Sequence, residues 1–192
     1  MKIAVYGAAS NNIDKIYIET VEELGRKMGQ RGHSLVFGGG STGLMGAAAR
    51  GIHETSGKIL GIAPTFFKSV DGALYPHCDE IIYTDSMRER KFLLEEHSDA
   101  FIITPGGVGT FEEFFEVFTL KQLHQLDKAI VIYNINGYYD TMEKMIDEAI
   151  EKKFMSENNR ELYKFFTTDE QILDYIENYQ EQNKKNYRNV WN

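Results

Sequence analysis

The 192-residue sequence contains one cysteine, Cys78, and only three prolines. A single cysteine excludes an intramolecular disulfide and a structural zinc site built on cysteines, and it suits a reducing compartment. We therefore expect a cytoplasmic protein. No stretch approaches the 18 apolar residues that a membrane-spanning helix needs, and the first apolar run is too short for a secretory signal.

Basic residues are also scarce relative to acidic ones. The chain has 21 Lys and Arg against 29 Asp and Glu, a net charge of −8. This balance disfavours nucleic acid and anionic membranes as partners, but it leaves room for a small basic pocket. The five histidines show no metal-ligand spacing, so we expect no metal site. The length predicts one domain, which we place at 1–180, followed by a polar tail at 181–192.

Short apolar runs alternate with amphipathic segments along the whole chain. The predicted strands are 3–6, 34–37, 58–63, 80–83, 100–104 and 129–133, with 161–167 open between a short strand and a loop. The predicted helices are 13–28, 44–53, 87–97, 111–126, 138–152 and 171–179. This alternation predicts an α/β fold, namely a Rossmann-like, doubly wound, mostly parallel sheet with helices on both faces. Ligands of such sheets bind beyond the carboxyl ends of the strands.

The first glycine-rich loop, GGGSTGLMG at 38–46, lies between a predicted strand and a predicted helix. This context suits phosphate binding, because glycines let the backbone approach and the helix start offers unpaired N–H groups. The loop is not a P-loop, since no lysine precedes Ser41 or Thr42. It also departs from the NAD fingerprint, because the next strand ends without an acidic residue. The alternative is a tight turn with close helix–strand packing.

The second glycine-rich loop, PGGVGT at 105–110, follows a very apolar strand. Thr110 and Glu113 have the spacing of a capping box, so Glu113 could serve only as a helix cap. Helical geometry favours a further role: Glu113 shares its stripe with Val117 and Leu120, which predicts that it points inward. Its neighbour begins a polar stripe made of Glu112, Glu116 and Thr119. An inward carboxylate beside a glycine-lined cleft is a candidate catalytic group.

Three cations, Arg88, Arg90 and Lys91, lie at the start of the helix predicted at 87–97. Ser86 and Glu89 form a second capping-box spacing there. The helix dipole disfavours each cation by about 0.3–1 kcal/mol, and a bound anion would offset this. The alternative is a solvated charged face paired with nearby glutamates. Two glycine loops at the same sheet edge favour a phosphate partner, for which arginine offers a bidentate fork.

Together these residues resemble the Lonely Guy (LOG) family, which was once widely mislabelled as lysine decarboxylases. The family signature Pro-Gly-Gly-x-Gly-Thr-x-x-Glu is matched in full at 105–113. Its companion motif, usually Met-His-x-Arg-Lys, is matched by Met87, Arg90 and Lys91. Arg88 stands at the histidine position, which is a departure from the family pattern.

The resemblance extends over nearly the whole chain up to about residue 180. The glycine loop at 38–46 and the segment 126–140 also look like those of the family. The first strand and its loop differ, because this chain has YGAAS at 6–10 where the family more often has Cys-Gly-Ser-Ser. In that loop Ser10 could reach a phosphate or ribose, although such a serine is more often a helix cap.

The resemblance implies hydrolysis of the N-glycosidic bond of nucleoside 5′-monophosphates. The implied substrates are AMP and N6-modified cytokinin riboside monophosphates, and the products are the free base and ribose 5-phosphate. It also implies a homodimer that uses no cofactor and no metal. A decarboxylase would need pyridoxal phosphate on a lysine, whereas the motifs supply a carboxylate and an arginine.

The same resemblance implies roles for the motif residues. Glu113 and Arg90 would be catalytic, with Arg90 near the ribose and phosphate. For Glu113 three roles stay open: stabilising an oxocarbenium-like state, activating water, or forming a transient covalent bond. The expected substrate-binding residues are Met87, Lys91, Gly39, Gly40, Ser41, Gly106, Gly107, Val108, Gly109 and Thr110.

The competing hypothesis is a non-catalytic nucleotide or cofactor carrier on the same fold. The joint presence of Arg90 and Glu113 favours the enzyme. One domain of this length has little interior left for five phenylalanines on two helices, so we expect some of them at an isologous dimer interface. They are Phe92, Phe111, Phe114, Phe115 and Phe118. Tyr138, Tyr139 and Met142 look like helix-packing residues.

Overall fold

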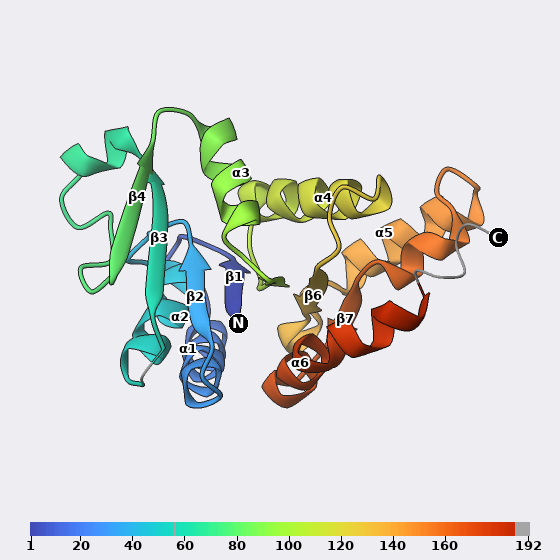
Figure 1. Ribbon diagram of the computed structural model, residues 1–192, viewed down its shortest axis with the longest axis horizontal. Helices are drawn as coiled ribbons and strands as arrows, with labels where there is room; N and C mark the ends of the chain where they lie inside the picture. The colour runs from blue at the N-terminus through green and yellow to red at the C-terminus, as the bar shows by residue number, and fades with distance from the viewer. Residues whose placement is uncertain (56, 187–192) are drawn as a thin grey trace.

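A computed structural model describes residues 1–55 and 57–186 of the chain (Figure 1). Seven strands form one sheet in the order β4-β3-β2-β1-β5-β6-β7, and every neighbouring pair is parallel. The strands are β1 (Lys2–Tyr6), β2 (Ser34–Phe37), β3 (Ile59–Pro64), β4 (Glu80–Thr84), β5 (Ala100–Ile103), β6 (Ala129–Tyr133) and β7 (Lys164–Phe166). The Rossmann-like α/β prediction is confirmed, and the open segment 161–167 contains β7.

Six helices cover the two faces of this sheet. They are α1 (Lys15–Gln30), α2 (Gly43–His53), α3 (Met87–Glu96), α4 (Val108–Gln122), α5 (Asp140–Glu151) and α6 (Asp169–Asn186). The short 3₁₀ helices are η1 (Thr65–Ser69), η2 (Ile135–Gly137) and η3 (Glu157–Glu161). One apolar core packs α1, α2 and α6 against the sheet, and a second packs α3, α4 and α5 against the opposite face (Figure 1). The central strands β1, β5 and β6 are covered on both sides and are apolar along nearly their whole length, whereas the edge strands β4 and β7 are partly exposed.

The strand order reverses between β1 and β5, which is where doubly wound sheets open a crevice for ligands. The loops that leave these two strands touch each other: the backbone N–H of Ala8 donates to the carbonyl of Pro105 at 3.0 Å. The second glycine loop therefore begins directly at the switch point of the sheet.

Helix α4 differs from its prediction at both ends. It begins at Val108 with Gly107 as the N-cap residue, three residues before the predicted start. The capping box predicted from Thr110 and Glu113 is therefore wrong, because both residues lie inside the helix. The helix ends at Gln122, before His124 takes a left-handed φ of 57° that a helix cannot continue through.

Helix α6 continues to Asn186, seven residues beyond its predicted end at 179. The first part of the predicted tail is therefore helical, and the remainder, 187–192, lies outside the described residues. Within the part that the structure describes, no helix is long and apolar enough to cross a membrane.

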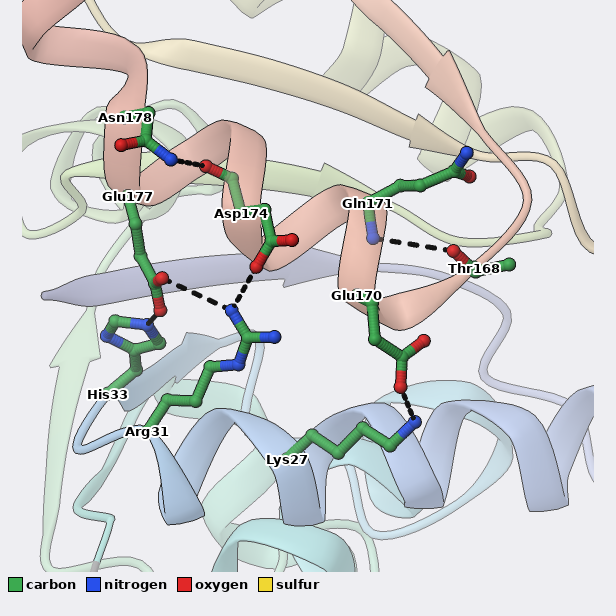
Figure 2. Close-up of polar contacts among 9 residues, drawn as sticks. All are labelled: Lys27, Arg31, His33, Thr168, Glu170, Gln171, Asp174, Glu177 and Asn178. Atoms are coloured by element: carbon green, nitrogen blue, oxygen red, sulfur yellow. Dashed lines mark hydrogen bonds and ion pairs between the residues drawn. The ribbon is translucent and has the colours of Figure 1, made fainter.

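Ion pairs fasten α6 to α1 (Figure 2). Arg31 lies 2.6 Å from Asp174 and 3.2 Å from Glu177, and His33 Nε2 lies 2.8 Å from the other carboxylate oxygen of Glu177. Each partly exposed pair adds little alone, but several that share partners form a network. The network holds the last helix over the core that α1 and α2 share with the sheet.

The five phenylalanines of α3 and α4 differ in burial. Phe114 and Phe118 are buried, stack at 5.7 Å between ring centroids, and pack edge-on against Tyr163. The domain interior therefore encloses two of the five rings, and Phe111 and Phe115 are partly buried against the same core. Phe92 on α3 is 56% exposed and has no such place.

Candidate active site

The side chains of Arg90 and Glu113 meet beside the switch point of the sheet. Arg90 comes from the first turn of α3 and Glu113 from the second turn of α4. Arg90 Nη1 lies 3.4 Å from Glu113 Oε1, and the side chains are only 11% and 13% exposed. The predicted inward orientation of Glu113 is confirmed. Its side chain is 13% exposed, whereas that of its neighbour Glu112 is 55% exposed.

The Glu113 carboxyl is held close to its protonation midpoint at neutral pH. Burial raises its pKa to about 7, the adjacent Arg90 and the more distant Lys91 lower it, and Glu112 raises it. Burial prevails because the long contact with Arg90 only partly replaces the lost water. A carboxyl with such a pKa can carry or release a proton under physiological conditions.

Helix α3 presents Arg90 through a well-formed start. The N–H of Glu89 donates to Ser86 Oγ at 3.1 Å, which confirms the predicted capping residue. The Glu89 carboxylate in turn accepts the N–H of Asp85 at 3.0 Å. Arg90 Nε donates to the carbonyl of Ile62 on β3 at 3.1 Å. The guanidinium is thus held from a strand on one side and from Glu113 on the other.

A cavity of about 390 Å³ opens beside Arg90. Its walls are mostly apolar. Of the described residues that line it, Arg90 alone carries a charge. Met87 of α3, Leu74 and the aromatic pair Phe66 and Phe67 of η1 form the apolar side. No sequence motif marks η1 or Leu74, because a loop that folds back over a distant site carries no local signature.

The start of α4 faces open space. Gly107, Val108 and Gly109 are exposed, and a Cβ atom on either glycine would meet nothing within 4 Å. The first N–H groups of a helix have no partner inside it, and no side chain caps these in the described structure. Thr110 is buried beneath them, against Gly106, where a Cβ would overlap its hydroxyl. This end of α4 is a suitable place for an anion.

Two tyrosines that precede α5 hydrogen-bond to the backbone of the second glycine loop and of the residue before it. Tyr138 Oη donates to the carbonyl of Gly106 at 2.6 Å, and Tyr139 Oη donates to that of Thr104 at 2.7 Å. Tyr139 is also buried in the core, as expected of a packing residue, so its hydroxyl adds a second role to its packing. Tyr138 and Ser10 also line a smaller cavity of about 240 Å³ beside the loop. Ser10 does not cap α1, whose N-cap residue is Asp14.

The first glycine loop uses several of its donors internally. The N–H of Ser41 donates to Ala73 at 3.0 Å, that of Gly43 to the Asn11 side chain at 2.8 Å, and that of Leu44 to the carbonyl of Ala8 at 2.8 Å. Gly39 and Gly40 lie in the turn, and Gly39 needs its glycine for a φ of 80°. The start of α2 is therefore closed where the start of α4 is open.

Lys91 points away from the cavity. Its ammonium pairs with the carboxylates of Glu112 and Glu116, the latter at 2.8 Å. This arrangement matches the predicted polar stripe on α4 and ties α3 to α4. Arg88 is exposed on α3 and is not among the residues that line either cavity.

Comparison with known proteins identifies the family. Residues 45–176 match a family model described as possible lysine decarboxylase. The chain is 33% identical over 180 residues to the cytokinin riboside 5′-monophosphate phosphoribohydrolase LOG5 of Arabidopsis thaliana, covering 93% of this chain and 78% of that protein. The chain belongs to the LOG family. Arabidopsis LOG3 is 34% identical, with coverage of 93% and 82%, which again spans most of both LOG family chains.

Solved structures show that the LOG family fold is shared more widely. The molybdenum cofactor carrier protein of Chlamydomonas reinhardtii has a TM-score of 0.70 and 18% identity, covering 93% of this chain and 97% of its own. The molybdenum cofactor binding protein of Rippkaea orientalis has a TM-score of 0.66 and 16% identity, with coverage of 92% and 93%. At these identities the likeness concerns the fold.

The decarboxylase description of the family model does not fit this site. Amino-acid decarboxylation by pyridoxal phosphate needs a lysine that forms a Schiff base with the cofactor. No lysine is among the described residues that line either cavity, and Lys91 is engaged by two glutamates. The site offers an arginine and a buried carboxyl with a raised pKa instead.

Proposed function

We propose that this LOG family protein hydrolyses the N-glycosidic bond of nucleoside 5′-monophosphates in the cytoplasm. The proposed substrates are AMP and N6-modified cytokinin riboside monophosphates, the class named in its relatives. The observation that carries the proposal is the buried Arg90–Glu113 pair: Arg90 lines an apolar cavity, and Glu113 belongs to the helix whose start is open. Such a site offers a carboxylate for the ribosyl carbon, with a cation beside it.

The subsites follow from the chemistry of each wall. The 5′-phosphate would bind at the start of α4, on the N–H groups of Gly107, Val108 and Gly109 and on the Thr110 hydroxyl. The base would lie in the apolar cavity against Met87. The closed start of α2 makes the first glycine loop a poorer phosphate cradle than the second.

The proposed mechanism centres on the Glu113 carboxylate. Cleavage of an N-glycosidic bond develops positive charge on the ribosyl carbon, as cleavage of an O-glycoside does. Charge stabilisation, water activation and covalent attack all require the ionised form of Glu113. Arg90 favours that form and would also bind the ribose or phosphate, so the pair acts as one unit.

Incubation with AMP and with its N6-isopentenyl analogue tests the function. We expect the free base and ribose 5-phosphate in equal amounts, measured by chromatography and by a reducing-sugar assay. Tight binding of either nucleotide without release of base would instead support the carrier hypothesis. Neither binding nor turnover would contradict both.

We further propose a homodimer that buries Phe92 of α3. More than half of this ring is exposed, and Val108 at the start of α4 is 84% exposed. We expect light scattering at micromolar concentration to give twice the 22.0 kDa chain mass, and Phe92→Glu to shift it toward the monomer. A wild-type monomer under these conditions would contradict the proposal.

A further inference from the structure

Gly38 directly follows β2 and lines the same cavity as Arg90. A Cβ atom at this position would overlap Nη2 of Arg90 and would lie 3.2 Å from its Cζ. The backbone of Gly38 is not in the left-handed region, unlike that of Gly39 and Gly43. Other residues could adopt the backbone conformation of Gly38. Glycine is therefore needed here because it has no side chain and leaves room for Arg90.

That space belongs to the guanidinium of Arg90. Its Nε is bonded to the Ile62 carbonyl, its Nη1 lies against Glu113, and its Nη2 lies over the backbone of Gly38. Each of the three nitrogens thus has its own neighbour, and those neighbours come from β3, α4 and the first glycine loop. A planar, rigid fork with two nitrogens hydrogen-bonded and the third close against a backbone has little freedom to turn.

We infer that Gly38 is a positioning residue for the reaction. By lacking a side chain, it lets the first glycine loop hold the Arg90 guanidinium in its catalytic position. This inference rests on the proposed function only in taking Arg90 as a catalytic residue; the contact between Gly38 and Arg90 does not depend on it. It gives the first glycine loop a role that does not require contact with phosphate.

The physical consequence of a methyl group at this position follows directly. The far end of a long side chain yields more easily than a backbone, so Gly38→Ala should fold with the guanidinium displaced. Misplacing a catalytic group by about 1 Å can cost about 10²-fold in rate. We therefore expect kcat/KM to fall by roughly that factor.

A matched control is available on the neighbouring strand. Gly61 of β3 is also buried, but a Cβ there would meet its nearest atom, Cys78 Sγ, at an ordinary 3.4 Å. Gly61→Ala should therefore keep both its melting temperature and its activity. Gly38→Ala should still fold to the native structure, as circular dichroism would show, and lose activity.

Titration of the Glu113 carboxyl by carbon NMR gives a readout that does not depend on turnover. The charged or titratable groups that act on it are Arg90 and Lys91 from α3 and Glu112 from its own helix; the buried Tyr6 hydroxyl of β1 lies in the same field. Moving Arg90 away removes the strongest influence that lowers the Glu113 pKa. We expect this pKa to rise above its wild-type value in Gly38→Ala and to stay unchanged in Gly61→Ala.

A double-mutant cycle completes the test. If Gly38 acts through Arg90, the pair Gly38→Ala and Arg90→Ala should be no less active than Arg90→Ala alone. Additive losses, or a Gly38→Ala protein with unchanged activity and an unchanged Glu113 pKa, would overturn the inference. If the wild type releases no base, the proposed function fails, but the NMR titration still decides whether Gly38 seats Arg90.

Discussion

Replacement of Glu113 by glutamine should lower kcat by at least about 10²-fold, the lower end of what one positioned acid–base group contributes. Glutamine keeps the shape of the side chain and can still accept from Arg90, but it has no negative charge. The control is Glu112→Gln in the same helix. Its carboxylate is exposed, and Lys91 keeps Glu116 as a partner, so kcat should stay within a few-fold.

The stability of the same variant separates a catalytic carboxylate from a structural one. Because the folded-state pKa of Glu113 is raised to about 7, folding favours its protonated form. Wild-type stability is therefore lost as pH rises from about 4.5 through 7, by on the order of 3 kcal/mol when ionisation is complete. Glutamine cannot ionise, so Glu113→Gln should melt higher than the wild type at pH 8, with the difference shrinking toward pH 5.

Both measurements can contradict the catalytic assignment. An active Glu113→Gln protein would show that the charge is not needed. A variant whose activity loss follows a lowered melting temperature at every pH would make Glu113 a structural residue.

Removal of the 5′-phosphate from the substrate should have an effect of similar size. Adenosine would leave the start of α4 and the Arg90 guanidinium without their anion. Charge-assisted contacts contribute about 1.5–3 kcal/mol each, so losing two should lower kcat/KM by at least about 10²-fold relative to AMP. Steady-state rates of base release from both compounds measure this directly.

One side chain allows the phosphate contact to be located. Thr110→Val preserves shape but removes the hydroxyl proposed to reach the phosphate, so it should slow AMP hydrolysis and leave the adenosine rate unchanged. Thr119→Val, on the exposed face of the same helix, should alter neither rate. Equal kcat/KM of the wild type for AMP and adenosine would refute the phosphate site. An equal loss of both rates in Thr110→Val would show that Thr110 does not contact the phosphate.

Much of the architecture was predictable because it depends on short-range patterns. All six strands predicted outright are present, because each contains a short apolar run, and the central ones are covered on both faces. The inward orientation of Glu113 followed from Val117 and Leu120 at helical spacing. The start of α4 was harder to predict, because Gly107 and Gly109 look like loop residues. Gly109 nevertheless lies in the first turn of the helix.

The sequence by itself determined the parallel α/β fold, the two glycine loops at one sheet edge and the pairing of Arg90 with Glu113 as motif residues. Only the tertiary structure decided which loop keeps free N–H donors and what surrounds the arginine. The partners responsible are distant in the chain: Asn11 closes the start of α2, 32 residues away, and Gly38 makes room for Arg90. Local sequence sets which groups a segment offers, whereas long-range packing sets which of them remain unpaired and therefore able to bind a ligand.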